Sequence, residues 1–287
     1  MSPTLRSHSY GKQRIRLTHL DRSSPPHRLT IVAVGVALEG DFAASYTEGD
    51  NRKVVATDSI KNTVYVLARE RGVASIEAFG IALARHFVGT YATVESARID
   101  LEEEIWSPIR VGSHLESHAA PDAFERTASE LGSAEVSLRG DELAVTSGID
   151  GIQVLKTAHS GFVDFVRDRF TTLPDVDDRI FATTVRARWR LGSVASSAID
   201  LRELRAGVRR VLVETFARHA SLAVQQTLHA MGAAVLERFA AVAEIHLVMP
   251  NQHHLLVNLA PFELDNPNRV FVGTDEPFGQ IEATLVR

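Results

Sequence analysis

Apolar and charged side chains alternate along the segment from Phe181 to Leu191. Every second residue there is apolar or a threonine, and Arg186, Arg188 and Arg190 fill intervening positions. Because successive side chains of a β-strand point to opposite faces, this period of two predicts a strand with one buried and one charged face. Half-buried strands are typical of antiparallel sheets, since parallel sheets are covered on both faces. The alternation therefore favours an antiparallel sheet.

The first half of the chain predicts two strands, two helices and a third strand. Strand patterns run from about Lys12 to Leu20 and from about Arg28 to Glu39, on either side of a turn rich in Pro and Ser. Apolar residues recur at helical spacing after Asp58 and again from about Ile76 to Phe87. Alternation returns between Ala97 and Leu101, which predicts the third strand.

The second half repeats this order. A short apolar run at 152–155 precedes the alternating segment, and a long helical pattern follows over 201–239, with a break near Ala220. Strand patterns return at 242–249 and 254–259. The repeated order predicts an α+β fold made of a duplicated antiparallel sheet with helices on one face.

The length of 287 residues, 45% of them hydrophobic, is enough for one large domain or two modest ones, and the repeated element order favours two. We expect a flexible N-terminus at 1–9, a first domain at 10–147 and a second domain at 148–287. The stretch 109–125, which contains His114 and His118, reads as a loop without a clear assignment.

Charge and composition exclude several classes of function. The net charge of -5 gives no basic field for nucleic acid, so the three arginines more simply form the solvated face of a strand or line a lumen. The absence of cysteine excludes disulfides, thiol nucleophiles and zinc-thiolate sites. The longest apolar run, Ile31 to Leu38, is far shorter than the roughly 20 residues of a membrane span. With no secretory or peroxisomal signal evident, we expect a cytoplasmic protein.

Thr57, Asp58 and Ser59 directly precede a helical pattern. These residue types favour a helix N-cap, which explains them on spacing alone. The same position also presents amide N–H groups and the positive end of the helix dipole to an anion. The two interpretations are compatible.

Two further residues could move protons. Lys12 begins a strand; a lysine there is usually a solvated end charge, but a partly desolvated one can take a proton from a hydroxyl. His253 and His254 lie between strand patterns and point to opposite faces of a strand, so they cannot readily bind one metal ion together. We expect no metal site.

Four fragments resemble the signatures of the urate oxidase family in identity and order, and together they span nearly the whole chain. They are Tyr10–Lys12, Val55–Thr63, Thr171–Leu173 with Asp178–Arg179, and Pro250–His253. The resemblance implies two tandem tunnelling-fold (T-fold) domains with helices on the outer face of the sheets. It also implies a homotetramer that forms a barrel-like tunnel, with active sites between subunits. The implied reaction oxidises urate with O2 and water to 5-hydroxyisourate and H2O2, without cofactor or metal.

The resemblance also implies roles for single residues. Lys12, Thr57 and His253 match proton-relay positions, and Thr57 and Asn251 match positions that hold O2 or water. The positions implied to bind substrate are Thr57, Asp58, Phe162, Arg179, Val224, Gln225 and Asn251.

The residue types suit this chemistry. Urate is a flat anion edged with N–H and C=O groups, so a guanidinium such as Arg179 can bind it through two parallel bonds, and the Gln225 amide offers a donor and an acceptor. Phe162 can stack on the ring, and the amides of Asp58 and Val224 can complete the in-plane contacts. Without the resemblance, a core Phe, a surface Arg and a solvated Gln explain these residues as well.

Three rival functions remain as alternatives. A pterin-handling enzyme of the same fold, such as a cyclohydrolase or aldolase relative, typically anchors its heterocycle with glutamate and often uses zinc, whereas this chain has Gln225 and no cysteine. A non-catalytic purine-binding protein would keep Arg179, Gln225 and Phe162 but need not keep Lys12 with Thr57. A tunnel that binds nucleic acid through the three arginines is opposed by the net charge.

Overall fold

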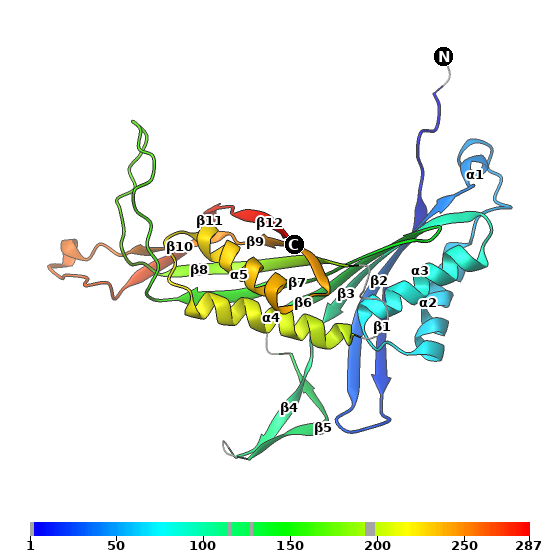
Figure 1. Cartoon of the computed structure of the whole chain (residues 1–287), viewed down its shortest axis with the longest axis horizontal. Helices are drawn as coiled ribbons and strands as arrows, with labels where there is room; N and C mark the ends of the chain where they lie inside the picture. The colour runs from blue at the N-terminus through cyan, green and yellow to red at the C-terminus, as the bar shows by residue number, and fades with distance from the viewer. Residues whose placement is uncertain (1–2, 114–115, 127–128, 193–198) are drawn as a thin grey trace. The chain divides into compact units, whose positions relative to one another are not determined.

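The computed structural model describes residues 3–113, 116–126, 129–192 and 199–287. The chain divides into two compact units, residues 1–149 with 193–205 and residues 150–192 with 206–287. Strand β7 (Glu142–Lys156) and helix α4 (Leu201–Arg218) each contribute to both units (Figure 1). The units are described in turn.

The first unit contains an antiparallel sheet in the strand order β1, β2, β3, β6, β7. Strands β1 (Tyr10–Asp21) and β2 (Arg28–Gly40) form a hairpin, which confirms the first two predicted strands. Strand β2 also pairs with β3 (Val94–Glu104), and β3 pairs with β6 (Leu131–Arg139). The buried side chains of β2 alternate as predicted: Val32, Val34, Val36 and Leu38.

The helices of the first unit are α1 (Ala43–Thr47), α2 (Thr57–Arg71) and α3 (Ile76–Thr90). Helix α2 lies against β1, and α3 packs on β3 and β6. Gly80 allows α3 to approach the sheet closely, because a Cβ there would lie 2.8 Å from the Val136 side chain. The apolar stripe of α2 is buried, as the helical spacing predicts: Ile60, Val64, Leu67 and Ala68.

The stretch 109–125 is not a loop. It contributes to a separate two-stranded antiparallel sheet made of β4 (Ser107–Gly112) and β5 (Ser117–Glu125). The strands were missed because most of their side chains are exposed or half-buried and show no apolar alternation. His118 is exposed, and His114 lies outside the described residues.

In the second unit, β8 (Phe181–Leu191) pairs with β9 (Val242–Val248), and β9 pairs with β12 (Glu282–Val286). Strand β10 (Asn251–Leu256) joins β8 through the pair Gln252 and Ala182, and also pairs with β11 (Phe271–Gly279). The predicted strand at 254–259 therefore starts three residues earlier and ends three residues earlier than expected.

The long helical pattern of the second unit is two helices. Helix α4 ends at Arg218, and α5 (Val224–Arg238) begins after a five-residue connection, which confirms the predicted break. Helix α5 packs on β9 and β12, and a short 3-10 helix, η1 (Ala260–Phe262), follows β10. Antiparallel sheets covered by helices confirm the α+β class.

The three arginines of β8 face acidic side chains. Arg186 and Arg188 both form ion pairs with Asp150, and Arg190 pairs with Glu244. Two carboxylates thus partly offset the three positive charges on this face, as expected for the solvated face of a half-buried strand.

A buried ion cluster joins the start of α4 to the first unit. The Arg205 guanidinium pairs with Glu77 of α3 at 3.2 Å and with Glu103 of β3, and all three side chains are nearly inaccessible to solvent. Ser147 of β7 also donates to Glu77. Because an unpaired charge is costly in the interior, each member of this cluster depends on the others.

We predict that Arg205→Ala lowers the free energy of unfolding by about 3–5 kcal/mol, because it leaves the buried Glu77 without its cation and leaves Glu103 to the more exposed Arg202, at 3.4 Å. Chemical unfolding followed by circular dichroism measures the change. The control is Arg139→Ala, which removes an ion pair to Glu39 from a side chain that is 56% exposed; its expected loss is at most about 1 kcal/mol. Equal losses in the two variants would contradict the prediction.

Candidate functional site

The start of β1 is held against the segment that leads into α2. The Tyr10 hydroxyl oxygen accepts a hydrogen bond from the Val55 amide at 2.7 Å, and the Tyr10 ring packs edge-on against Phe42. Gly11 lets β1 approach β2, because a Cβ there would lie 1.8 Å from the Val36 carbonyl oxygen. Tyr10 and Gly11 therefore determine the position of Lys12, the next residue, relative to α2.

The N-terminus of α2 is open. Its N-cap is Ala56, with no side-chain cap hydrogen bond, so the interpretation of Thr57, Asp58 and Ser59 as capping residues is wrong. The Asp58 carboxylate instead binds Lys61 at 2.6 Å and Asn62 at 2.9 Å. The N–H groups of the first turn are therefore left without a side-chain cap, unlike those of α3, which Ser75 caps.

Lys12 interacts electrostatically with Asp58 at this helix end. The pKa of Asp58 is lowered mainly by its hydrogen bond to Lys61, with a smaller contribution from the charge of Lys12. Lys12 and Thr57 are both exposed, and within the described ranges no hydrogen bond joins them. The first unit thus brings Lys12 near the open end of α2 without forming a relay contact.

In the second unit, Arg179 lies over the ring of Phe162, with 5.5 Å from the guanidinium carbon to the ring centroid. The Arg179 amide donates to the Ser160 carbonyl at 2.7 Å, and Phe162 exchanges backbone hydrogen bonds with Val176. Burial lowers the pKa of Arg179, and its buried Nε has no hydrogen-bond partner among the described residues. This donor is therefore both shielded from water and unpaired, which is unfavourable for a guanidinium N–H.

The N-terminus of α5 lies beside the same segment. Ser160 and Ser221 form a β-bridge, and the Gly161 amide donates to the Ser221 carbonyl at 2.8 Å. Val224 and Gln225 are the first residues of α5, whose N-cap has no side-chain cap hydrogen bond. A second open helix end thus accompanies Arg179 and Phe162.

Asn251 and His253 lie on β10, opposite Gly279 and Thr274 of β11, with a register shift between the two pairs. This strand places them at the sheet, and the described contacts do not link them directly to Arg179. Gln252 and His254 alternate with them along β10, and these two side chains line a hollow that does not include Arg179.

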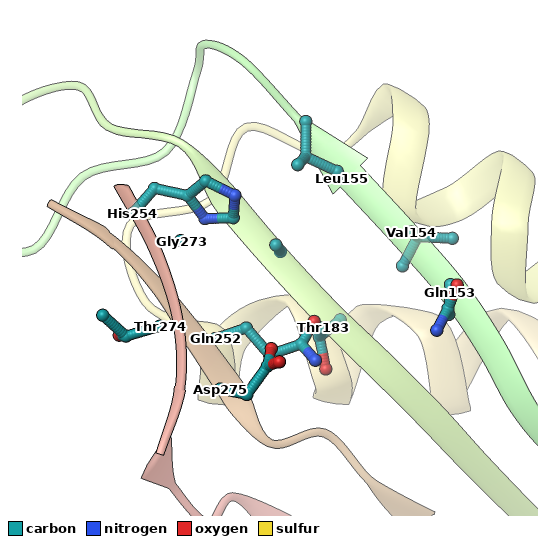
Figure 2. Close-up of a pocket in the computed structure, with 10 residues that line it drawn as sticks. Gln153, Val154, Leu155, Thr183, Gln252, His254, Gly273, Thr274 and Asp275 are labelled. Atoms are coloured by element: carbon teal, nitrogen blue, oxygen red, sulfur yellow. The ribbon is translucent and has the colours of Figure 1, made fainter. Parts of the chain in front are cut away.

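That hollow has a volume of about 480 Å³ and lies along β7, β8, β10 and β11. Figure 2 shows polar side chains from all four strands around it, namely Gln153, Thr183, Gln252, His254, Thr274 and Asp275. Sequence reasoning named Gln252 and His254 only as neighbours of His253, without a role, and it missed Gln153, Thr183, Thr274 and Asp275, which no motif marks. In the described ranges, no three His, Asp or Glu side chains gather as metal ligands, and no helix is long and apolar enough to cross a membrane.

The uricase family model matches residues 8–137 and 145–282 of this chain. The chain belongs to the uricase family. It is 42% identical to the uricase of Arthrobacter globiformis over 283 residues, covering 99% of this chain and 90% of that protein. The uricase of Arabidopsis thaliana is 39% identical, with 97% and 94% covered.

Solved structures agree with this assignment. The crystal structure of the Arthrobacter globiformis uricase superposes with a TM-score of 0.90 at 41% identity and covers 100% of this chain and 96% of that one. A uricase from Bacillus fastidious has a TM-score of 0.83 at 23% identity, which shows a common fold. Both segments matched by the uricase model contain predicted site residues.

We predict that Gly11→Ala destabilises the chain by about 1–3 kcal/mol, since the added methyl meets a backbone carbonyl that cannot rotate away. The control is Gly89→Ala in α3, where a Cβ meets nothing within 4 Å. That change should leave stability equal or raise it by up to about 1 kcal/mol. Midpoints of chemical unfolding compare the two, and equal midpoints would refute the steric role of Gly11.

Proposed function

We propose that this chain is a urate oxidase that converts urate, O2 and water into 5-hydroxyisourate and H2O2 without a cofactor. The observation that carries the proposal is the half-buried Arg179, whose buried Nε has no partner among the described residues and whose guanidinium lies over Phe162 beside the open end of α5. A flat purine anion fits this combination of a cation, a ring face and helix N–H groups.

Recognition would use the second unit. Arg179 would bind one edge of urate through parallel hydrogen bonds, Gln225 would read a neighbouring donor and acceptor, and the Val224 amide would complete the contacts. Phe162 would stack on the ring. Such a set favours a planar anion over a nucleic-acid backbone, whose phosphates need no ring face.

Removal of the proton from urate would use the first unit. Lys12 would withdraw a proton from Thr57, and Thr57 would withdraw one from bound urate, directly or through water, while the Asp58 amide holds the substrate. The urate dianion is electron-rich and would reduce O2 itself, so the protein need not supply a redox group. Asn251 would hold O2 or water, and His253 would assist proton movement as water adds to the oxidised purine.

The assembly we propose is a homotetramer of T-fold domains, 10–147 and 148–287 in each chain, that forms a barrel-like tunnel with active sites between subunits. Two observations support it. Strands β1 and β12 stand at the ends of their pairing orders, and unpaired strand edges are suited to pairing with another chain. Lys12 and Thr57 are exposed, whereas a proton relay needs the desolvation that a neighbouring subunit would provide.

We predict that the purified protein consumes urate and releases peroxide in aerated buffer, and that a strong chelator leaves the rate unchanged. Lys12→Met should lower kcat by at least about a hundredfold, because it removes the base of the relay. Ultraviolet absorbance of urate and a peroxide assay provide the measurement. Binding of urate without turnover in the wild-type protein would instead identify a purine-binding protein, and loss of activity with chelator would favour the zinc-dependent pterin class.

A complementation experiment tests the shared site. Lys12→Met and Arg179→Ala chains should each be inactive alone. On co-expression, mixed assemblies should regain about a quarter of the wild-type rate, because random assortment gives about a quarter of the sites both an intact Lys12 and an intact Arg179. Activity of the purified mixture against each variant alone is the measurement. No recovery in assemblies shown to contain both chains would mean that each site is built from one chain.

A further inference from the structure

We infer that Lys156 and His219 are positioning residues for urate recognition, acting through the connection between α4 and α5. The inference rests on the proposed function and extends it to two side chains that would not touch the substrate. The connection consists of residues 219–223 and leads directly into Val224 and Gln225.

Lys156, the last residue of β7, binds the end of α4. Its ammonium group donates to the Phe216 carbonyl at 3.2 Å and to the His219 carbonyl, and it lies 5.5 Å from the centroid of the Phe216 ring. The last carbonyls of a helix have no partners within the helix and carry its negative end, so a cation is favoured there. Lys156 therefore fixes where α4 stops and the connection starts.

His219 binds the connection to α5. Its Nδ1 lies 3.1 Å from the hydroxyl of Thr227, which is 0% exposed in the second turn of α5. Burial lowers the pKa of His219, and the charge of Lys156 lowers it further, so the neutral ring is favoured. The hydrogen bond thus joins the end of one helix to the body of the next.

Backbone hydrogen bonds transmit this position to the proposed site. The Ser221 amide donates to the His159 carbonyl at 2.9 Å, and the Gly161 amide donates back to Ser221 at 2.8 Å. Ser160, between them, accepts from the Arg179 amide at 2.7 Å. The connection is therefore the common support of Arg179, Phe162 and the open end of α5.

Apolar packing contributes little to the fixed position of the connection. Leu222, in the middle of the connection, is 70% exposed, and Ala220 is exposed as well. A segment with so little buried apolar surface depends on its hydrogen bonds for a fixed position. Since these bonds hold groups that we propose for recognition of the substrate, their loss should weaken urate binding and should be measurable as a change in KM.

The test compares Lys156→Met with Lys156→Arg and His219→Ala with His219→Asn. Lys156→Met and His219→Ala should raise KM for urate about tenfold with kcat within about twofold, because recognition is displaced while the relay of Lys12 and Thr57 is intact. Arg can still reach the carbonyls and Asn can replace Nδ1, so both should restore most of the wild-type KM. Binding of xanthine by equilibrium dialysis should weaken in parallel.

The matched control is Arg218→Met. Arg218 is the last residue of α4, with a side chain that is 82% exposed, and within the described residues its only ion pair is to Glu214 at 4.0 Å. This change removes a cation from the same helix end without removing a bond to the connection, and should leave KM unchanged.

An unchanged KM in folded Lys156→Met and His219→Ala, or an equal rise in Arg218→Met, would overturn the inference alone. A fall in kcat at constant KM would also overturn it. If Lys156→Met does not fold, the KM and kcat values of Lys156→Arg, His219→Ala and His219→Asn test the inference by the same criteria. Wild-type protein that oxidises no urate would overturn the proposed function and this inference together.

Discussion

Antiparallel strand pairing with one apolar face is the constraint on which the rest of this structure depends. In the first unit, β2 pairs with β1 on one side and β3 on the other, and its inward valines are almost inaccessible to solvent. A sheet with such a face must be covered, and helices α2 and α3 cover it. The position of each helix end, and therefore of each candidate anion site, follows from this packing.

The helix ends divide into two kinds. Ser75 caps α3 by accepting from the Ala78 amide, as expected for a helix whose start has only a structural role. Helices α2 and α5 instead begin after alanines that make no side-chain cap hydrogen bond, and both begin where the family resemblance expects an amide to meet substrate. Helix α1 also begins without a side-chain cap, so a missing cap does not by itself mark a ligand site. At α2 and α5 it leaves N–H groups available where the resemblance expects substrate.

Periodicity predicted most of the elements that bury apolar residues, but it missed β6, in which Ala134, Val136 and Leu138 are buried. The alternation of β2 and β8 and the break between α4 and α5 were all readable from spacing. Strands β11 and β12 were missed because their side chains are mostly exposed, so no apolar pattern marks them. The bond from Lys156 to His219 joins residues 63 positions apart, and neither spacing nor the family fragments could indicate it.

Two arginines show how partner geometry separates a structural charge from a functional one. Arg205 is buried against two carboxylates, so its charge is compensated within the fold. Arg179 is half-buried, is stacked on Phe162, and keeps a buried Nε without a partner among the described residues. A guanidinium donor that is removed from water and left unpaired is unfavourable in the free protein. A bound anion would offset that cost, and for this reason Arg179, although less buried than Arg205, is the arginine that we propose for recognition.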